Sequence, residues 1–324
     1  MIRTKSWRLA LAARLARLVP PGFSGVFLRL YPPRLAQRER AAFTARSSLA
    51  NVEFQCDRPD WVANSFAIRG FYEWAIVNIA NSICRPGDTI IEVGANIGTE
   101  SLLYAAIVGP AGRVASFEPF PDNLRMLRRQ LDLNRLTHVD VFPNAVSDQQ
   151  GTLHFVAPVD EGNFGQGHLA DPGAASPAGG KTIDVECVRL DDLFAAGQLL
   201  APRLLVIDVQ GAELGVLRGG REMIRAARPY LVLEVDPEFL VGQGLSVEAV
   251  QKMLEEWGYR AWSISKWGLR PARTDITHDA NWLCIPSQDG DAVARRVSRR
   301  LWWSAVLPLI PGLSPAVIRP HAPH

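Results

Sequence analysis

The chain has 324 residues, of which 48% are hydrophobic and 21% charged, a composition typical of a folded globular protein with one large α/β domain or two small ones. Its net charge of +2 hides an asymmetry, because residues 1–50 carry +9, residues 291–324 carry +4 and the residues between carry −11. An acidic body with basic ends argues against a nucleic-acid partner. Four widely spaced cysteines with no C-x-x-C pair argue against a local zinc motif and favour a reducing compartment.

The two ends of the chain are basic and apolar. Residues 1–23, MIRTKSWRLALAARLARLVPPGF, predict an amphipathic helix that ends at Pro20-Pro21, and Arg14 and Arg17 interrupt the apolar core that a signal peptide needs. Residues 301–318 carry no charge but contain three prolines, which disfavours a regular spanning helix. These ends predict peripheral contact with an anionic membrane, and the alternative is a tail that packs on the domain or is disordered.

Between the ends, apolar runs of strand length alternate with helical patterns. The predicted strands are 90–93, 114–117, 139–142, 204–208, 231–235, 260–264 and 282–285. The predicted helices are 97–108, 121–134, 213–226 and a segment that begins after the N-cap Ser246 and ends at Gly258. This alternation predicts a mostly parallel sheet with helices on both faces. We expect a basic N-terminal extension at 1–50, an α/β domain at 51–288 and a C-terminal tail at 289–324.

One region departs from this alternation. Residues 151–190 read as a strand, a long loop and a second strand, and a loop of this length in a compact domain is functional or mobile.

The turn after the first predicted strand carries the strongest functional signal. Ligands of open α/β sheets bind beyond the carboxyl ends of the strands, and the turn from Glu92 to Gly98 lies at such an end. Gly94 and Gly98 allow close approach of the backbone to a ligand, and Glu118 follows the next strand, where it is placed to accept hydrogen bonds from a ribose. The spacing G-x-x-x-G is neither the dinucleotide pattern nor a P-loop, which favours a ligand with a ribose and one carboxylate.

Six segments resemble the FkbM-type S-adenosylmethionine-dependent methyltransferases, over about residues 66–286. They are IIEVGANIGTES, VASFEPFPDNLRMLRRQLDLN, VFPNAVSD, RLLVIDVQGAELGVLRGG, RPYLVLEV and NWLCIP. The resemblance implies a class I (Rossmann-like) methyltransferase fold, with a seven-stranded, mostly parallel sheet whose last strand is antiparallel, helices on both faces and an N-terminal helical extension.

The same resemblance implies a set of cofactor contacts for S-adenosyl-L-methionine. Glu92, Gly94, Asn96 and Gly98 fall on the methionine-binding turn, and Ser101 is one helical turn further on. The other implied contacts are Glu118 at the ribose, Ala145 and Val146 at the adenine, and Glu73 in the helix before the sheet.

Asp208, at the end of the fourth strand, is the candidate catalytic residue. A hydroxyl nucleophile has a high pKa, so a base or a metal would assist its methylation, and Asp208 and Glu234 are candidate ligands for Mg²⁺. Glu213 is better explained as an acid in the first turn of a helix. The candidate acceptor contacts are Asn163 and His168 in the long loop and Trp267, an aromatic residue able to stack on a sugar.

The sequence therefore predicts an O-methyltransferase that acts on a sugar hydroxyl of a glycan, glycolipid or related natural product. The alternatives are a nicotinamide-dependent oxidoreductase and a cofactor-binding module without catalysis. We expect a cytoplasmic protein with a small-molecule or glycan acceptor, located at the inner membrane face if its ends bind lipid.

Overall fold

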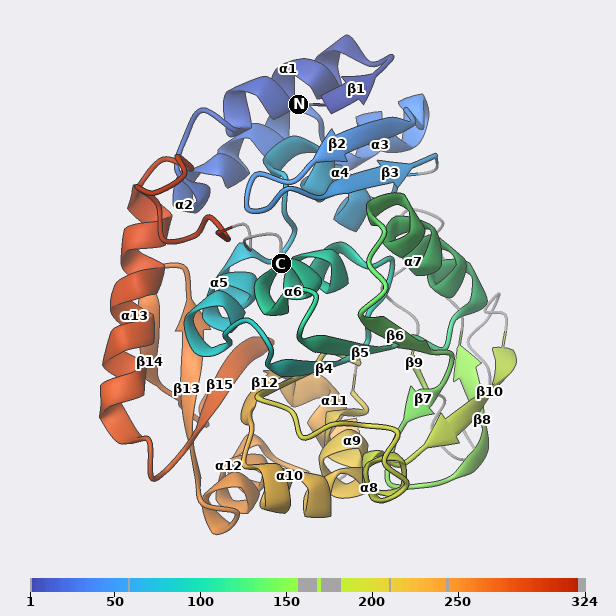
Figure 1. The fold of residues 1–324 in the computed structure, drawn as a ribbon, viewed down its shortest axis with the longest axis vertical. Coiled ribbons are helices and arrows are strands. Elements are labelled where there is room, and N and C mark those ends of the chain that lie inside the picture. Colours follow the sequence, from blue (N-terminus) through green and yellow to red (C-terminus); the bar gives the residue numbers. More distant parts are fainter. Residues whose placement is uncertain are drawn as a thin grey trace.

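A computed structural model describes residues 2–57, 59–156, 168–169, 182–209, 211–242 and 245–319. A central sheet carries helices on both faces, and two smaller sheets lie beside it (Figure 1).

The central sheet has eight strands in the order β14-β13-β15-β12-β11-β4-β5-β6. They are β4 (Thr89–Val93), β5 (Arg113–Phe117), β6 (Val139–Phe142), β11 (Leu204–Ile207), β12 (Tyr230–Val235), β13 (Tyr259–Ser265), β14 (Gly268–Pro271) and β15 (Ala280–Pro286). The five strands from β6 to β12 are parallel, and β15 lies antiparallel between β12 and β13. This confirms the expected seven-stranded arrangement with a reversed last strand. The eighth strand, β14, is the second arm of a hairpin with β13.

Successive residues of the central strands enter two different hydrophobic cores. On β4, Ile90 belongs to one core and Ile91 to the other. Helices α5 (Trp74–Ile83), α6 (Thr99–Val108), α7 (Pro121–Asn134) and α13 (Gly290–Val306) cover the first core. Helices α8 (Leu190–Ala195), α9 (Glu213–Gly219), α10 (Arg221–Ala227), α11 (Pro237–Gly242) and α12 (Val247–Glu256) cover the second. Burial on both faces explains why the strands are apolar throughout.

The N-terminal residues form a layer of their own against the first core. The layer contains β1 (Ile2–Thr4), α1 (Trp7–Ala16), α2 (Pro21–Ser24), η1 (Gly25–Leu30), α3 (Pro33–Glu39), β2 (Phe43–Arg46), β3 (Glu53–Cys56) and α4 (Trp61–Arg69). Two amide side chains of α7 complete the free edge of β3. Asn134 exchanges two hydrogen bonds of 2.7 Å with the backbone of Glu53, and Gln130 exchanges two of 2.9 and 2.8 Å with Gln55. These bonds fix the N-terminal sheet to the α/β body.

A four-stranded side sheet follows β6, in the order β7-β10-β8-β9. Its strands are β7 (Ala145–Val146), β8 (Gly151–Val156), β9 (His168–Leu169) and β10 (Thr182–Val188). The two strands predicted on either side of the long loop are confirmed as β8 and β10, which pair antiparallel. Most of the loop between them lies outside the described residues.

Several predicted helix boundaries were wrong, each for a local reason. Helix α1 ends at Ala16, before the two prolines, and the helix predicted at 213–226 is broken at Gly220, whose φ is −114°. The helix after the first strand begins at Thr99 because Asn96 and Gly98 both have positive φ.

The C-terminal residues return to the N-terminal layer. Helix α13 ends at Val306, and the N–H of Ile318 donates to the carbonyl of Leu49 at 2.7 Å. The domain ranges 1–50, 51–288 and 289–324 stay predictions. Leu9 of the first range and Leu301 of the last belong to one hydrophobic core, and the two ends pack together. Among the described residues, no helix is long and apolar enough to cross a membrane.

Candidate functional site

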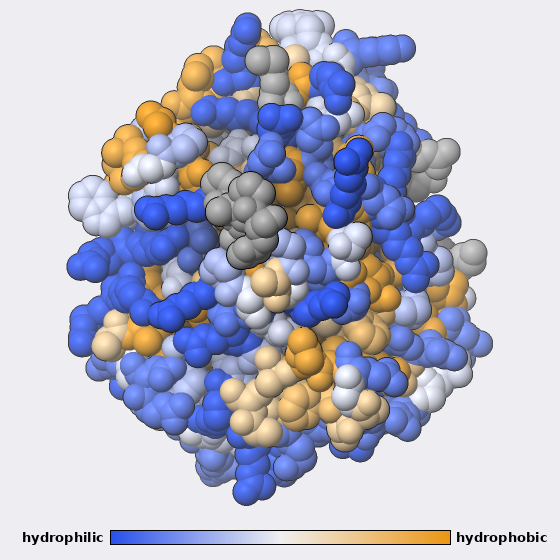
Figure 2. Space-filling view, viewed as in Figure 1, coloured by the Kyte–Doolittle hydropathy of each residue, from blue (hydrophilic) through white to orange (hydrophobic). Residues whose placement is uncertain are grey.

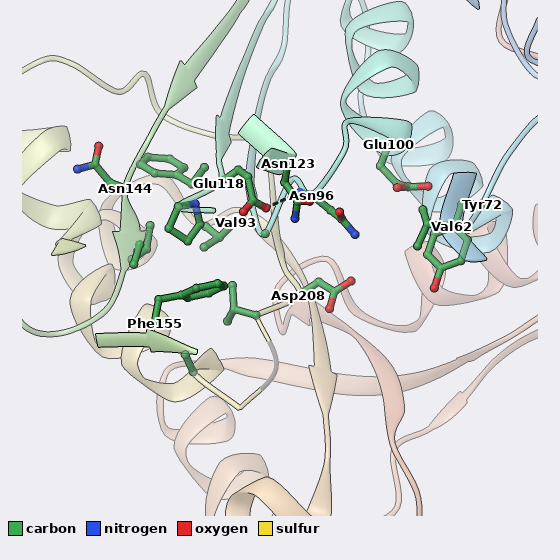
Figure 3. Close-up of a pocket in the computed structure, with 17 residues that line it drawn as sticks. Val62, Tyr72, Val93, Asn96, Glu100, Glu118, Asn123, Asn144, Phe155 and Asp208 are labelled. Atoms are coloured by element: carbon green, nitrogen blue, oxygen red, sulfur yellow. Dashed lines mark hydrogen bonds between the residues drawn. The ribbon is translucent and has the colours of Figure 1, made fainter. Parts of the chain in front are cut away.

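A cavity opens at the carboxyl ends of the parallel strands, as predicted from the turn after β4. Its empty space, including the mouth, is about 790 Å³. Most of its lining residues lie at or just after the ends of β4, β5, β6 and β11, and the others belong to α4, α6, α7, β7 and β8 or to the segments before α5 and α9. Figure 3 shows Asn144 and Phe155 at one end of this cavity, Glu118 and Asn96 in the middle, and Glu100 and Tyr72 at the other end, with Asp208 below the middle.

The floor of the cavity is the turn after β4. Gly94 has a φ of +95°, and a Cβ placed there would lie 1.8 Å from the carbonyl oxygen of Asp208. Only glycine therefore lets the ends of β4 and β11 approach this closely. Asn96 also has a positive φ, of 49°, and its side-chain oxygen is buried with no hydrogen-bond partner among the described residues. Since buried polar atoms are normally paired, this oxygen points to a donor on a ligand.

Glu118 is held by its backbone neighbours so that its carboxyl group faces the cavity. The N–H of Asn96 donates to Oε2 and the N–H of Phe120 donates to Oε1, both at 2.8 Å. A carboxylate oxygen accepts more than one hydrogen bond, so both oxygens keep capacity for a ligand's hydroxyls. Burial raises the pKa of Glu118 to about 7, while these hydrogen bonds and one from Asn123 act in the opposite direction.

The end of the cavity beyond Glu118 suits a flat apolar ring. Ala145 and Val146 of β7 line it, together with Phe117 and Phe155. Phe155 stacks on Phe120 with ring centroids 6.0 Å apart, which fixes the orientation of its ring.

The opposite end of the cavity is acidic. Asp208 is exposed at the end of β11, and Glu234 of β12 forms a hydrogen bond with it. Burial first, and then the charge of Asp208, raise the pKa of Glu234 to about 8. Burial likewise raises the pKa of Glu100 to about 7 and that of Glu73 above its usual range, and Asp208 contributes to both shifts. A bound cation would lower these raised pKa values, because an opposite charge nearby favours the ionised form of a carboxyl group.

The N-terminal layer shapes the wall beside these acids. Arg69 donates to the carbonyl of Tyr72 at 2.8 Å and to the hydroxyl of Ser65, and its charge opposes the raised pKa of Glu73. Gly70 has a φ of +83°, and Ser47 and Ser48 bond its carbonyl at 2.7 and 3.1 Å. The loop between β2 and β3 therefore fixes the turn that carries Tyr72 and Glu73.

A smaller cavity and an outer groove continue from the acidic end. Asp208, Glu100 and Tyr72 line both the main cavity and the smaller one. Glu73 and Asn281 line both the smaller cavity and a groove whose empty space, including its mouth, is about 670 Å³. The groove ends at Ser265 and Lys266, after β13. Asp208 thus lines both the main cavity and the smaller cavity.

Three residues predicted to contact the methionine end have other contacts in the structure. The Ser101 hydroxyl is fully buried and donates to Glu92, which also accepts from Ser116 at 2.9 Å. A Cβ at Gly98 would lie 2.6 Å from the Leu127 side chain. We therefore reassign Ser101 and Glu92 to support of the turn, and Gly98 to the packing of α6 against α7. Burial raises the pKa of Glu92 to about 8.

Of the predicted acceptor contacts, the structure describes the side chain of Trp267 only, and Trp267 is not among the lining residues of the cavity. Trp267 lies in the turn after β13 and is 42% exposed, and its ring contacts Phe23 of α2 with centroids 5.9 Å apart. The backbone of His168 pairs with Val156 in β9, and Asn163 lies outside the described residues.

The structure also adds residues that the sequence reasoning missed. Tyr72, Glu100, Asn123 and Phe155 all line the cavity. The one available signal was Glu100, an acid in the first turn after the glycine turn.

The proposed Mg²⁺ site gains no support. Within the ranges that the structure describes, no group of three or more His, Cys, Asp or Glu side chains is placed to hold a metal ion. Asp208 and Glu234 form a hydrogen-bonded pair of carboxyl groups.

Comparison with known proteins identifies a family. The model for the family described as Methyltransferase FkbM domain matches residues 92–261, about half of the chain. The 2-O-methyltransferase NoeI of Sinorhizobium fredii is 27% identical over 187 residues, which cover 54% of this chain and 74% of that protein.

Two further relatives are also named as methyltransferases. The 31-O-demethyl-FK506 methyltransferase FkbM of Streptomyces tacrolimicus is 33% identical over 159 residues, 42% of this chain and 60% of that protein. The hexuronic acid methyltransferase AglP of Haloferax volcanii is 24% identical over 184 residues, 57% of this chain and 68% of that protein. The match to the Streptomyces protein thus spans less than two thirds of its length.

Proposed function

This chain belongs to the FkbM methyltransferase family and is an S-adenosylmethionine-dependent methyltransferase, and we propose that it methylates a hydroxyl oxygen of a sugar. Family membership decides against the nicotinamide-dependent oxidoreductase. The observation that carries the proposal is the position of Asp208, which faces the cofactor cavity on one side and the cavity that leads to the outer groove on the other.

The cavity residues fit the chemical groups of the cofactor. We assign the ribose to Glu118, the adenine to Ala145, Val146 and Phe155, and the methionine end to Gly94 and Asn96. The unpaired oxygen of Asn96 is an acceptor for an ammonium or hydroxyl group, and the acidic end matches the two positive charges of the sulfonium and the amino group.

When bound, S-adenosylmethionine supplies an activated methyl group, so the protein's main task is to align the acceptor oxygen and exclude water. In the proposed reaction Asp208 accepts the proton that leaves the acceptor hydroxyl. Glu234, with a pKa of about 8, keeps its proton at neutral pH and donates a hydrogen bond to Asp208. Glu234 is thereby a positioning residue that holds the Asp208 carboxylate toward the acceptor.

Two observations support a sugar as the acceptor, namely the lining of the outer groove and the names of two relatives. The groove places the polar groups of Glu73, Asn281 and Lys266 beside the apolar residues Ile76 and Ile264, and polar groups set in an apolar lining can bind the hydroxyls and the ring of a sugar. The relatives include a hexuronic acid methyltransferase and a 2-O-methyltransferase.

We also propose a cytoplasmic location. All four cysteines are free and buried, which suits a reducing compartment.

The test is transfer of a labelled methyl group to a panel of free sugars, oligosaccharides and glycolipids, with the product analysed by mass spectrometry. We expect a gain of one CH₂ unit on a sugar oxygen. Transfer to nitrogen or carbon, or to non-sugar hydroxyls only, would contradict the proposal. A parallel comparison of glycans from cells with and without the gene identifies the natural acceptor.

A further inference from the structure

The exposed apolar side chains of this protein are concentrated at its two ends. Among the residues that the structure describes, fifteen large hydrophobic side chains are exposed, and ten of them lie in residues 7–30 and 302–313. These ten are Trp7, Leu11, Leu18, Phe23, Val26, Leu30, Trp302, Trp303, Ile310 and Leu313. We call this set, with the arginines between them, the terminal surface.

Helix packing brings the two ends together. Helix α2 lies on α13 so closely that a Cβ at Gly22 would meet the carbonyl oxygen of Ala305 at 2.8 Å. Figure 1 shows α2 beside the end of α13, and in Figure 2 apolar side chains gather at the upper left over the same region, next to hydrophilic ones. Phe23, Trp302 and Trp303 therefore belong to neighbouring elements.

Helices α1 and α13 expose tryptophan, leucine and arginine side chains on their outer faces. Helix α1 buries Leu9, Ala12, Ala13 and Ala16 and exposes Trp7, Leu11 and Arg14, at spacings of four and three residues that place them on one face. Helix α13 likewise exposes Arg295, Arg299 and Trp302 on one face. A helix face exposed to water is normally polar, whereas these faces combine large apolar side chains with arginines, a mixture that indicates an interaction surface.

The segments that form the terminal surface are strongly basic. Residues 1–50 contain ten Lys and Arg and a single acid, Glu39, and residues 291–324 contain five Arg and a single acid, Asp291. Arg8, Arg14, Arg29, Arg295 and Arg299 are all exposed. Tryptophan and leucine interleaved with arginine on a helix face are typical of segments that lie at the interface of an anionic bilayer.

We propose that the terminal surface binds an anionic lipid bilayer, with the apolar side chains of α1, α2, η1 and α13 among the acyl chains and the arginines at the headgroups. Peripheral binding requires no spanning helix, and none is found among the described helices.

The surface adjoins the outer groove. Lys266 lines the groove, and the next residue, Trp267, contacts Phe23 of the terminal surface. A protein bound through this surface would hold the groove near the headgroups, where a glycolipid presents its sugar. This second step rests on the proposed function, whereas lipid binding does not.

The test is flotation of the full-length protein with vesicles of phosphatidylcholine alone or of phosphatidylcholine with phosphatidylglycerol. We expect flotation with the anionic vesicles only, and its loss at high salt because salt screens the arginines. The variant Arg295→Glu/Arg299→Glu should weaken binding about twentyfold or more, since each basic residue near the surface contributes about fivefold.

A second variant tests the apolar contacts against a matched control. Phe23→Ser/Trp302→Ser/Trp303→Ser should lose flotation, whereas Leu133→Ser/Leu200→Ser, which removes exposed leucines outside the terminal surface, should retain it. Unchanged affinity for S-adenosylhomocysteine in each variant shows that the fold is intact.

Three outcomes would overturn the proposal. They are no flotation of the wild-type protein with anionic vesicles, equal loss in the Leu133/Leu200 control, and self-association in solution that depends on Trp302 and Trp303, which would make the surface a protein interface. Vesicle binding needs no acceptor, so its result is independent of whether sugar methylation is found.

Discussion

The two ends of the main cavity are built in different ways. Around Glu118, the proposed ribose contact, the carboxyl group is held by the N–H groups of Asn96 and Phe120, which belong to the turn after β4 and to the residues that follow β5. At the acidic end, Glu100 and Asp208 line the main cavity, Glu73 lines the smaller cavity beside it, and Glu234 is hydrogen-bonded to Asp208. Burial raises the pKa values of Glu73, Glu100 and Glu234, and the charge of Asp208 adds to each of these shifts. The Glu118 carboxyl group is thus fixed in place before a ligand binds. The acidic side chains carry raised pKa values that a bound cation would lower.

The largest effect should come from the acidic end. Asp208→Asn removes the proposed base with little change of shape, so kcat should fall by about 10²–10⁴ while the affinity for S-adenosylhomocysteine stays within about twofold. Steady-state kinetics and calorimetry measure the two quantities. Asp140→Asn, an exposed acid of β6, is the control. An unchanged kcat would remove Asp208 from the chemistry.

The second effect concerns stability. Burial raises the pKa of Glu92 to about 8 in the folded protein. Between pH of about 4.5 and 8 the folded state keeps a proton that the unfolded state has lost, so Glu92 lowers the free energy of unfolding by about 1.4 kcal/mol per pH unit as the pH rises. Glu92→Gln removes this slope.

Urea denaturation between pH of about 4.5 and 8 measures this pH dependence of the free energy of unfolding. The stability of Glu92→Gln relative to wild type should rise with pH, whereas Glu256→Gln, at an exposed position, should give a constant difference. A constant difference for both would show that Glu92 is ionised in the fold.

The ribose end should give a smaller, purely binding effect. Glu118→Ala removes two charge-assisted hydrogen bonds to the ribose, each contributing about 1.5–3 kcal/mol, and should weaken cofactor binding at least about tenfold. Calorimetry with S-adenosylhomocysteine measures this loss. Glu53→Ala, a partly exposed acid of β3, is the control, and equal affinities for the Glu118 variant and wild type would place the ribose elsewhere.

The smallest expected effect is a pH dependence of cofactor affinity, which can be measured on the wild-type protein. Raised pKa values of about 7 for Glu100 and about 8 for Glu234 mean that these groups gain negative charge as the pH rises from about 6 to 8. The affinity for S-adenosylmethionine should then rise severalfold relative to that for S-adenosylhomocysteine, which lacks the sulfonium charge. A ratio that does not change with pH would show that the acids do not face the sulfonium.

The ribose end could be predicted from the sequence because its residues lie in short segments next to apolar strands. Gly94, Asn96 and Glu118 all line the cavity as expected. The alternating pattern predicted the mostly parallel sheet, and the reversed last strand was implied by the family resemblance. Ser101 and Gly98 occur in the same segment, but the Ser101 hydroxyl donates to Glu92 and Gly98 packs against Leu127. Each residue along a helix turns the side chain by about 100°, so Ser101 faces the core although its neighbour Glu100 lines the cavity.

The acidic end could be predicted only in part. Asp208 directly follows β11 and Glu234 is the second-last residue of β12, so their position at this edge could be inferred from the sheet. Tyr72 and Glu100 reach the same cavity because the loop between β2 and β3 fixes the turn at Gly70 and because α6 begins two residues later than the helical pattern suggests. Glu100 had a local signal, as an acid in the first turn of a helix, whereas the position of Tyr72 depends on tertiary packing and leaves none.

The most direct measurement of the central claim is a crystal structure of the protein with S-adenosylhomocysteine. The account predicts the ribose hydroxyls on the Glu118 carboxylate, the adenine against Ala145 and Phe155, and the sulfur facing Asp208. Adenosine bound in the outer groove beside Lys266, or a ribose without contact to Glu118, would contradict it.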